Sequence, residues 1–375
     1  MKPLSVYIHI PFCVQKCKYC DFLSAPSTRE NMELYMDALK KEMISESVKY
    51  EEYEIETIFF GGGTPSILDE GQIEDCIDVL RTNYQISKLC EITLEMNPGT
   101  ASMQKLEGWK RAGVNRLSIG LQSANDSELR LIGRIHDFDT FVKSYEQAKA
   151  AGFDNINVDL MSALPGQTIS GWRETLNKVL LLEPDHISAY SLIIEEGTPL
   201  SKHIDEYPPV PSEDEDREMY RDTKRILKEH GFMRYEVSNY AKEGKECKHN
   251  VTYWTRGNYA GFGLGASSMV ENIRWHNTEN MDKYIKNPTE SKEDMEKLSL
   301  NDCMEEFMFL GLRMMQGVSK KRFFKEFDMN MDEVYGDVLK KWEKTGHLKM
   351  EGDNVSLTDS GIDISNAIFT DFLIE

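Results

Sequence analysis

Three cysteines near the start of the chain have the residue types and the spacing for metal chemistry. Cys13, Cys17 and Cys20 are spaced C-x3-C-x2-C and follow a short apolar run that favours a strand. Thiolates suit zinc and iron–sulfur clusters, but a closed zinc site takes four ligands, usually in two pairs. The remaining cysteines are scattered and supply no second pair: Cys76, Cys90, Cys247 and Cys303. Three local thiolates therefore favour a [4Fe-4S] cluster whose fourth iron is open to another ligand.

The residues around this trio resemble a known family. Tyr7-Ile-His-Ile-Pro-Phe-Cys13 places a tyrosine six residues before the first cysteine, and it resembles the coproporphyrinogen oxidase-like branch of the radical S-adenosylmethionine (SAM) superfamily. The resemblance implies a [4Fe-4S] cluster on the trio, with SAM bound to the open iron and cleaved to a 5′-deoxyadenosyl radical. Three buried structural cysteines are the alternative interpretation of the spacing.

The elements that must position these residues follow from hydrophobic periodicity. Short apolar runs alternate with longer amphipathic segments, which is typical of parallel βα units. We predict strands at 5–10, 56–60, 91–96, 116–121, 155–160 and 186–193. Between them we predict helices at 29–48, 69–84, 102–112, 137–151 and 170–182. Six units are too few for a closed eight-fold barrel, so we expect an α/β fold with an open three-quarter (βα)6 barrel, which the resemblance also implies.

Glycine and polar residues follow several of these strands, where a parallel sheet places its functional site. The run Gly61-Gly62-Gly63-Thr64-Pro65 comes directly after the second strand, and glycines let a ligand approach the backbone. A tight turn explains the same run. Glu95, Gln122 and Asp159 lie at the ends of the next three apolar runs. Buried polar groups need partners, which a bound ligand would supply, although each residue could also cap the following helix.

The resemblance assigns these residues to SAM. The positions that match SAM-contacting residues of the branch are Tyr7, Tyr19, Gly62, Gly63, Thr64, Glu95, Gln122, Arg134 and Asp159. Two positions depart from the family pattern, because Ser162 and Ala163 stand where relatives carry tyrosine and glycine. This difference affects the wall of the pocket and not the choice of cofactor.

A third motif, His249-Asn250-Val251-Thr252-Tyr253-Trp254, lies beyond the predicted barrel. Imidazole is a common haem ligand, and the aromatic pair could lie against a porphyrin face. A lone histidine is, however, more often a hydrogen-bonded loop residue. The HNxxYW string resembles that of haem chaperones within the branch, and this implies haem binding to which His249 contributes. Ser267, in the next glycine-rich turn, stands where relatives often carry histidine.

Composition limits the organisation and the partners of the chain. We predict a barrel at 1–211, an α+β extension with the HNxxYW motif at 212–300, and a winged-helix-like module at 301–375. The net charge of −20 argues against nucleic acid or an anionic membrane surface, because phosphate binding needs clustered Lys and Arg. No stretch approaches 18 apolar residues, and scattered cysteines suit a reducing compartment. We therefore expect a cytoplasmic protein without a membrane span.

Two functions fit the resemblance. One is a haem chaperone that binds a [4Fe-4S] cluster, SAM and haem, and delivers haem to acceptor proteins. The other is oxygen-independent coproporphyrinogen III oxidase, an oxidoreductase that decarboxylates propionate side chains. We expect the chaperone because Phe22 stands where the oxidases carry a fourth cysteine, the trio begins at residue 13 without their amino-terminal extension, and HNxxYW is present. The expected partners are a reductant for the cluster and haem-accepting proteins; homodimerisation is left open, and no catalytic residue is assigned.

Overall fold

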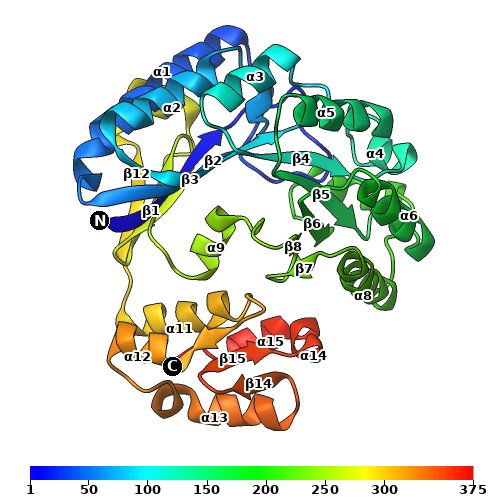
Figure 1. Ribbon diagram of the computed structural model, residues 1–375, viewed down its shortest axis with the longest axis vertical. Coiled ribbons are helices and arrows are strands. Elements are labelled where there is room, and N and C mark those ends of the chain that lie inside the picture. Colours follow the sequence, from blue (N-terminus) through cyan, green and yellow to red (C-terminus); the bar gives the residue numbers. More distant parts are fainter. Residues whose placement is uncertain (375) are drawn as a thin grey trace.

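The computed structural model describes residues 1–374 and confirms the α/β architecture (Figure 1). A 12-stranded sheet runs in the order β12-β11-β10-β9-β1-β2-β3-β4-β5-β6-β8-β7. Its middle strands are parallel, and each overlaps a predicted strand: β1 (Lys2–Ile10), β2 (Tyr53–Gly62), β3 (Gln85–Met96), β4 (Arg116–Gln122), β5 (Ile156–Ser162) and β6 (His186–Ser191). The barrel stays open, because β1 and β6 pair with β9 and β8 and not with each other.

The predicted helices lie between these strands and cover the outer face of the sheet (Figure 1). They are α1 (Arg29–Glu46), α2 (Gln72–Asn83), α3 (Met103–Arg111), α5 (Phe138–Ala150) and α6 (Ile169–Leu180). Thr28, Ser102, Asp137 and Thr168 cap four of them, each accepting a hydrogen bond from the backbone N–H three residues later. A further helix, α4 (Asp126–Leu131), was not predicted from the sequence, because six residues give too little periodicity.

The extension continues the sheet beyond both edges of the parallel strands. On one side are α7 (Pro199–Lys202), α8 (Glu213–Glu229), β7 (Met233–Arg234) and β8 (Asn239–Ala241). On the other side, after α9 (Lys248–Trp254), are β9 (Tyr259–Phe262), β10 (Ser267–Val270), β11 (Ile273–Asn277), α10 (Met281–Lys286) and β12 (Lys292–Lys297). Short 3-10 turns occupy Ser47–Tyr50, Pro65–Ile67, Ile204–Glu206 and Pro288–Glu290.

Residues 235–239 have a composition that favours a strand, but only Asn239 lies in one. These residues form most of the turn between β7 and β8, which pair antiparallel. The Glu236 carboxylate accepts a hydrogen bond from the Ser238 N–H at 3.1 Å, so the side chain competes with strand pairing. A β-favouring composition was therefore overridden by a local turn.

The carboxy-terminal module is built around a second hydrophobic core, to which Met269 of β10 and Leu298 also contribute. It contains α11 (Leu300–Gly311), β13 (Val318–Ser319), α12 (Lys320–Phe327), α13 (Met331–Lys344), β14 (Leu348–Glu351), β15 (Asn354–Leu357), α14 (Asp359–Asp363) and α15 (Ser365–Thr370). Phe307, Phe323 and Phe327 pack edge to face in this core, whereas buried residues of the barrel and much of the extension form one larger cluster. The division at 211 and 300 stays a prediction, and Glu375 lies outside the described residues.

Candidate functional site

The carboxyl ends of the parallel strands surround one pocket of about 380 Å³. Cys13, Cys17 and Cys20, in the loop after β1, all line it. Eight of the nine residues predicted to contact SAM line it as well: Tyr19, Gly62, Gly63, Thr64, Glu95, Gln122, Arg134 and Asp159. The structure therefore brings together residues that the sequence spreads over about 150 positions, as expected of strand ends in a parallel sheet.

Hydrogen-bond donors reach two of the three cysteine sulfurs. Thr64 Oγ1 donates to Cys13 Sγ at 3.5 Å, and Arg134 Nη1 donates to Cys17 Sγ at 3.5 Å. Among residues 1–374, no group of three or more His, Cys, Asp and Glu side chains is gathered closely enough to hold a single metal ion. A [4Fe-4S] cluster does not require such a grouping, because each thiolate binds a different iron. Three thiols around one cavity, with donors on two of their sulfurs, thus fit a cluster better than a zinc ion.

The other cysteines are buried in the core. Burial raises the pKa of the Cys76, Cys90 and Cys247 thiols to about 12. Because the thiolate is the form that binds metal, these side chains are poor ligands.

Arg134 connects the cysteine loop to the strand ends. Its Nη2 donates to Asn97 Oδ1 at 2.6 Å and to the Gly120 carbonyl at 2.5 Å. Asn97 in turn donates to Thr64 Oγ1 at 2.9 Å. Asn97 was not predicted from the sequence, although its position two residues after Glu95 was a usable signal. These bonds fix the donors that face the sulfurs.

Two carboxyl groups face the pocket next to these donors. Burial and the nearby Asp159 raise the pKa of Glu95 to about 8, although the Gly62 N–H donates to its carboxylate at 3.2 Å. Burial also raises the pKa of Asp159, against hydrogen bonds from Asn157 and Ser118 at 2.7 and 3.1 Å. A cationic ligand would favour the ionised form of both groups, so this wall suits a positive charge such as a sulfonium or an ammonium.

The glycine run packs against the cysteine loop itself. The Gly63 and Thr64 N–H groups donate to the Ile10 and Phe12 carbonyls at 2.8 and 2.7 Å. A Cβ at Gly63 would lie 2.6 Å from the Phe12 oxygen, so only glycine fits this approach. The run therefore joins β2 to the loop that presents the thiols.

Comparisons with known proteins agree with this geometry. Residues 7–179 match the Radical SAM superfamily, and residues 298–364 match the HemN C-terminal domain. The chain is 39% identical to the heme chaperone HemW of Bacillus subtilis (strain 168), over 99% of both chains. It is 37% identical to the heme chaperone HemW of Lactococcus lactis subsp. lactis (strain IL1403), over 100% of this chain and 98% of that one. The chain belongs to the HemW family of radical SAM proteins.

The HemW-type fold of this chain also matches a solved structure. Coproporphyrinogen III oxidase (HemN) from Escherichia coli superimposes with a TM-score of 0.84 and 23% identity, over 99% of this chain and 90% of that one. At this identity the likeness shows the fold alone. Within residues 1–374, no helix has the length and apolar character needed to cross a membrane.

The remaining predicted SAM residue, Tyr7, lies in a second cavity, which we call the interior chamber. This chamber has a volume of about 210 Å³ and shares Glu95, Ser118, Asp159 and Tyr190 with the cysteine pocket. The Tyr7 hydroxyl is hydrogen-bonded to His9 Nδ1 at 2.9 Å. Tyr7 therefore supports the strand that leads into the cysteine loop and does not line the cysteine pocket.

The HemW-type motif residue His249, on α9, faces the same interior chamber. Its side chain is buried, with Nδ1 hydrogen-bonded to Thr57 Oγ1 at 2.8 Å and Nε2 to Tyr253 OH at 2.9 Å. Burial, with a smaller effect of Arg116, lowers the pKa of His249 to about 3, so the ring is neutral. Both ring nitrogens are thus engaged inside the protein.

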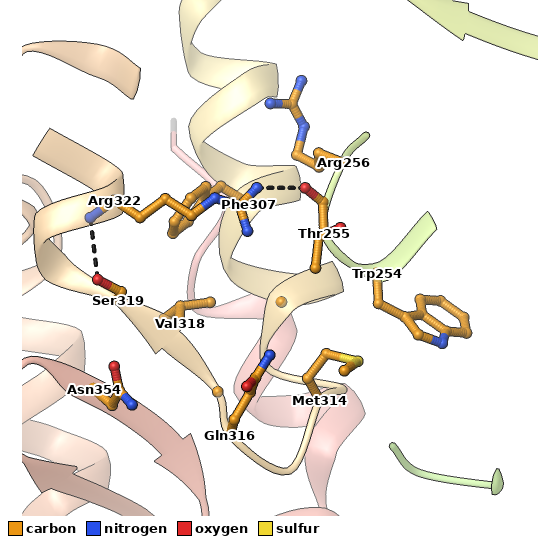
Figure 2. A pocket seen from close by; sticks show the side chains of 12 residues that line it. Trp254, Thr255, Arg256, Phe307, Met314, Gln316, Val318, Ser319, Arg322 and Asn354 are labelled. Carbon is orange, nitrogen blue, oxygen red and sulfur yellow. Dashed lines mark hydrogen bonds between the residues drawn. The ribbon is translucent and has the colours of Figure 1, made fainter. Parts of the chain in front are cut away.

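Trp254, the last residue of the motif, lines the edge of another cavity, of about 180 Å³, between α9 and the carboxy-terminal module (Figure 2). In this cavity Arg322 donates to the Thr255 carbonyl, and Arg256 pairs with Glu306 and Glu326 at 3.2 and 2.9 Å. The motif helix therefore contacts the barrel interior with one side and the module with the other.

The positions that depart from the family pattern lie in different settings. Ser162 is buried at the end of β5, and Ala163 has a φ of 57°, a left-handed conformation that favours glycine. Ser267 is exposed at the start of β10. Phe22, where the oxidases carry a cysteine, is 63% exposed and lines the cysteine pocket.

Proposed function

We propose that this chain is a haem chaperone that holds a [4Fe-4S] cluster and SAM in the cysteine pocket, binds haem and delivers it to acceptor proteins. The observation that carries the proposal is its similarity, over nearly its whole length, to proteins named heme chaperones. A reductant for the cluster is the second expected partner, and the cytoplasm is the proposed compartment.

The side chains of the cysteine pocket have distinct roles in this proposal. Cys13, Cys17 and Cys20 hold the cluster, and Thr64 and Arg134 stabilise negative charge on the Cys13 and Cys17 sulfurs, respectively. Such a cluster supplies one-electron reduction of SAM when both are bound. Glu95 and Asp159 orient the cationic part of SAM, and Tyr19 and Gln122 form the adjoining walls.

That His249 contributes to haem binding stays a prediction from the sequence. For a ring nitrogen to reach iron, α9 must release either Thr57 or Tyr253. An altered Soret band in His249→Ala would support ligation, because an imidazole ligand shapes the haem spectrum. Unchanged haem affinity and an unchanged spectrum would remove this residue from the proposal and leave the chaperone function standing.

A second candidate, oxygen-independent coproporphyrinogen III oxidase, is favoured by the structural match to HemN and by the HemN C-terminal domain. The decisive assay incubates reduced, cluster-reconstituted protein with SAM and coproporphyrinogen III in the absence of oxygen. We expect SAM binding without decarboxylation, because Phe22 cannot supply a fourth thiolate. Vinyl product formed over many turnovers would reverse the ranking.

A further inference from the structure

A groove lies where the extension meets the carboxy-terminal module. It has a volume of about 420 Å³ and is lined by residues of α8, β7, β15, α14 and the segments next to them. Proteins hold small molecules in pockets of roughly 300–1,000 Å³, so the groove is large enough for a ligand. Its apolar lining consists of Phe232, Met233, Met315, Leu357 and Ile362. We call this site the junction groove.

The charged residues of the junction groove are mostly cationic. Lys224, Lys228, Arg234 and Lys349 line it, with Asp359 as its only lining carboxylate among the described residues. Asp359 pairs with Lys224 at 2.5 Å and with Arg234 at 3.0 Å, and Lys349 pairs with Glu351 at 3.4 Å. Four cations against these two carboxylates leave a local charge of +2, in a chain whose net charge is −20. Such a site attracts anions where most of the protein repels them.

Arg234 is the rigid part of the junction groove. Its side chain is only 6% exposed, Nη1 donates to the Tyr220 hydroxyl at 3.0 Å, and Nη2 donates to Asp359 at 3.0 Å. The guanidinium also lies over the Tyr220 ring at 5.5 Å, and Nε has no hydrogen-bond partner within the described chain. A guanidinium already held in place binds a carboxylate with little further loss of side-chain entropy.

We propose that the junction groove binds an amphipathic dicarboxylate of the porphyrin type, with its ring against the apolar lining and its carboxylates against Arg234, Lys228 and Lys349. This inference rests on the proposed function, in which haem is the cargo. Burial of the porphyrin ring removes apolar surface from water. The porphyrin carboxylates form ion pairs with the excess positive charge of the junction groove. His249 does not line the junction groove, so the groove and ligation by His249 are alternative sites for the porphyrin, which the groove variants and His249→Ala distinguish.

The test is a titration of the full chain with metal-free protoporphyrin IX, followed by porphyrin fluorescence. Lys228→Glu combined with Lys349→Glu reverses two charges of the groove without touching the cysteine pocket. We expect a Kd raised by roughly tenfold or more, equivalent to ~1.4 kcal/mol. Lys41→Glu combined with Lys88→Glu makes the same charge change at exposed positions in α1 and β3, and we expect its Kd to match the parent.

The possible outcomes distinguish a failure of the groove assignment from a failure of the proposed function on which it rests. If the parent chain shows no saturable binding of protoporphyrin IX or haem, the proposed function fails and the groove with it. If the parent binds and the two double variants have equal Kd values, the groove assignment is overturned while the function stands. A third experiment titrates the parent chain with protoporphyrin IX dimethyl ester, in which both carboxylates are blocked. We expect the ester to bind roughly tenfold more weakly than protoporphyrin IX. Equal binding of the ester would contradict recognition by the cationic side chains.

Discussion

The cysteine pocket and the interior chamber share a wall but differ in how far their polar groups are already satisfied. In the pocket, three thiols face one cavity, with Thr64 and Arg134 donating toward two of them. In the interior chamber, both ring nitrogens of His249 are hydrogen-bonded, Nδ1 to Thr57 and Nε2 to Tyr253. Both ring nitrogens of His249 must therefore lose a partner before they can bind a ligand, whereas the three thiols already face an open cavity.

The largest expected effect is loss of the cluster. In Cys17→Ala, anaerobically reconstituted protein should lose the [4Fe-4S] absorption and nearly all bound iron and sulfide, because each thiolate holds one iron. Cys76→Ala should keep both, since that thiol is buried away from the pocket. Iron and sulfide equal to the parent in Cys17→Ala would remove this residue from the ligand set.

The second expected effect is a loss of folding stability when the hydrogen bonds of His249 in the interior chamber are removed. His249→Ala leaves the Thr57 and Tyr253 hydroxyls without their partner, and we expect urea unfolding to show a loss of ~2–4 kcal/mol. Tyr253→Phe removes one hydroxyl, keeps the ring and should cost only ~1 kcal/mol. If both variants unfold like the parent, the buried hydrogen bonds do not hold α9 in place.

The third expected effect is a pH dependence of folding stability that comes from Glu95 in the cysteine pocket. Its folded pKa of about 8 is above the ordinary value of 4.5, so the folded state binds more protons than the unfolded state between these limits. Stability of the cluster-free, SAM-free protein should therefore fall as pH rises from about 5 to 8, by at most ~1.4 kcal/mol per pH unit. Unfolding across this range should show a shallower slope in Glu95→Gln than in the parent. Parallel slopes would show that Glu95 is already ionised at neutral pH.

The smallest effect is expected at Ala163. Its left-handed backbone, with φ of 57°, costs an alanine ~1–2 kcal/mol, which the greater freedom of unfolded glycine offsets in part. Ala163→Gly should therefore be neutral or stabilise the fold by up to ~1 kcal/mol in urea unfolding. Ala150→Gly, at the exposed last residue of α5, should instead destabilise by up to ~0.5 kcal/mol, because the cost of glycine is smaller at a helix end than in its middle. Equal destabilisation by both changes would show that the strain at Ala163 is absent.

The sequence predicted the parallel strands and the cysteine pocket because both depend on local patterns. Apolar runs located the strands, and strand ends in a parallel sheet must meet, which brought Glu95, Gln122 and Asp159 to the pocket. Asn97 was missed because its role depends on contacts with Thr64 and Arg134, which lie far from it in the chain.

The sequence could not predict the surroundings of His249 or the junction groove. The partners of His249 include Thr57, 192 positions away, so its burial follows from how α9 packs into the barrel. The junction groove combines residues from Lys224 to Ile362, and no local spacing marks such a site. Tertiary packing decides both features.

The most direct test of the chaperone account is a haem titration of the cluster-reconstituted full chain, followed by the Soret band. The account predicts saturable binding of haem by the parent chain. It also predicts that Lys228→Glu with Lys349→Glu weakens this binding roughly tenfold while the [4Fe-4S] absorption is unchanged. A parent chain without saturable haem binding would contradict the central claim.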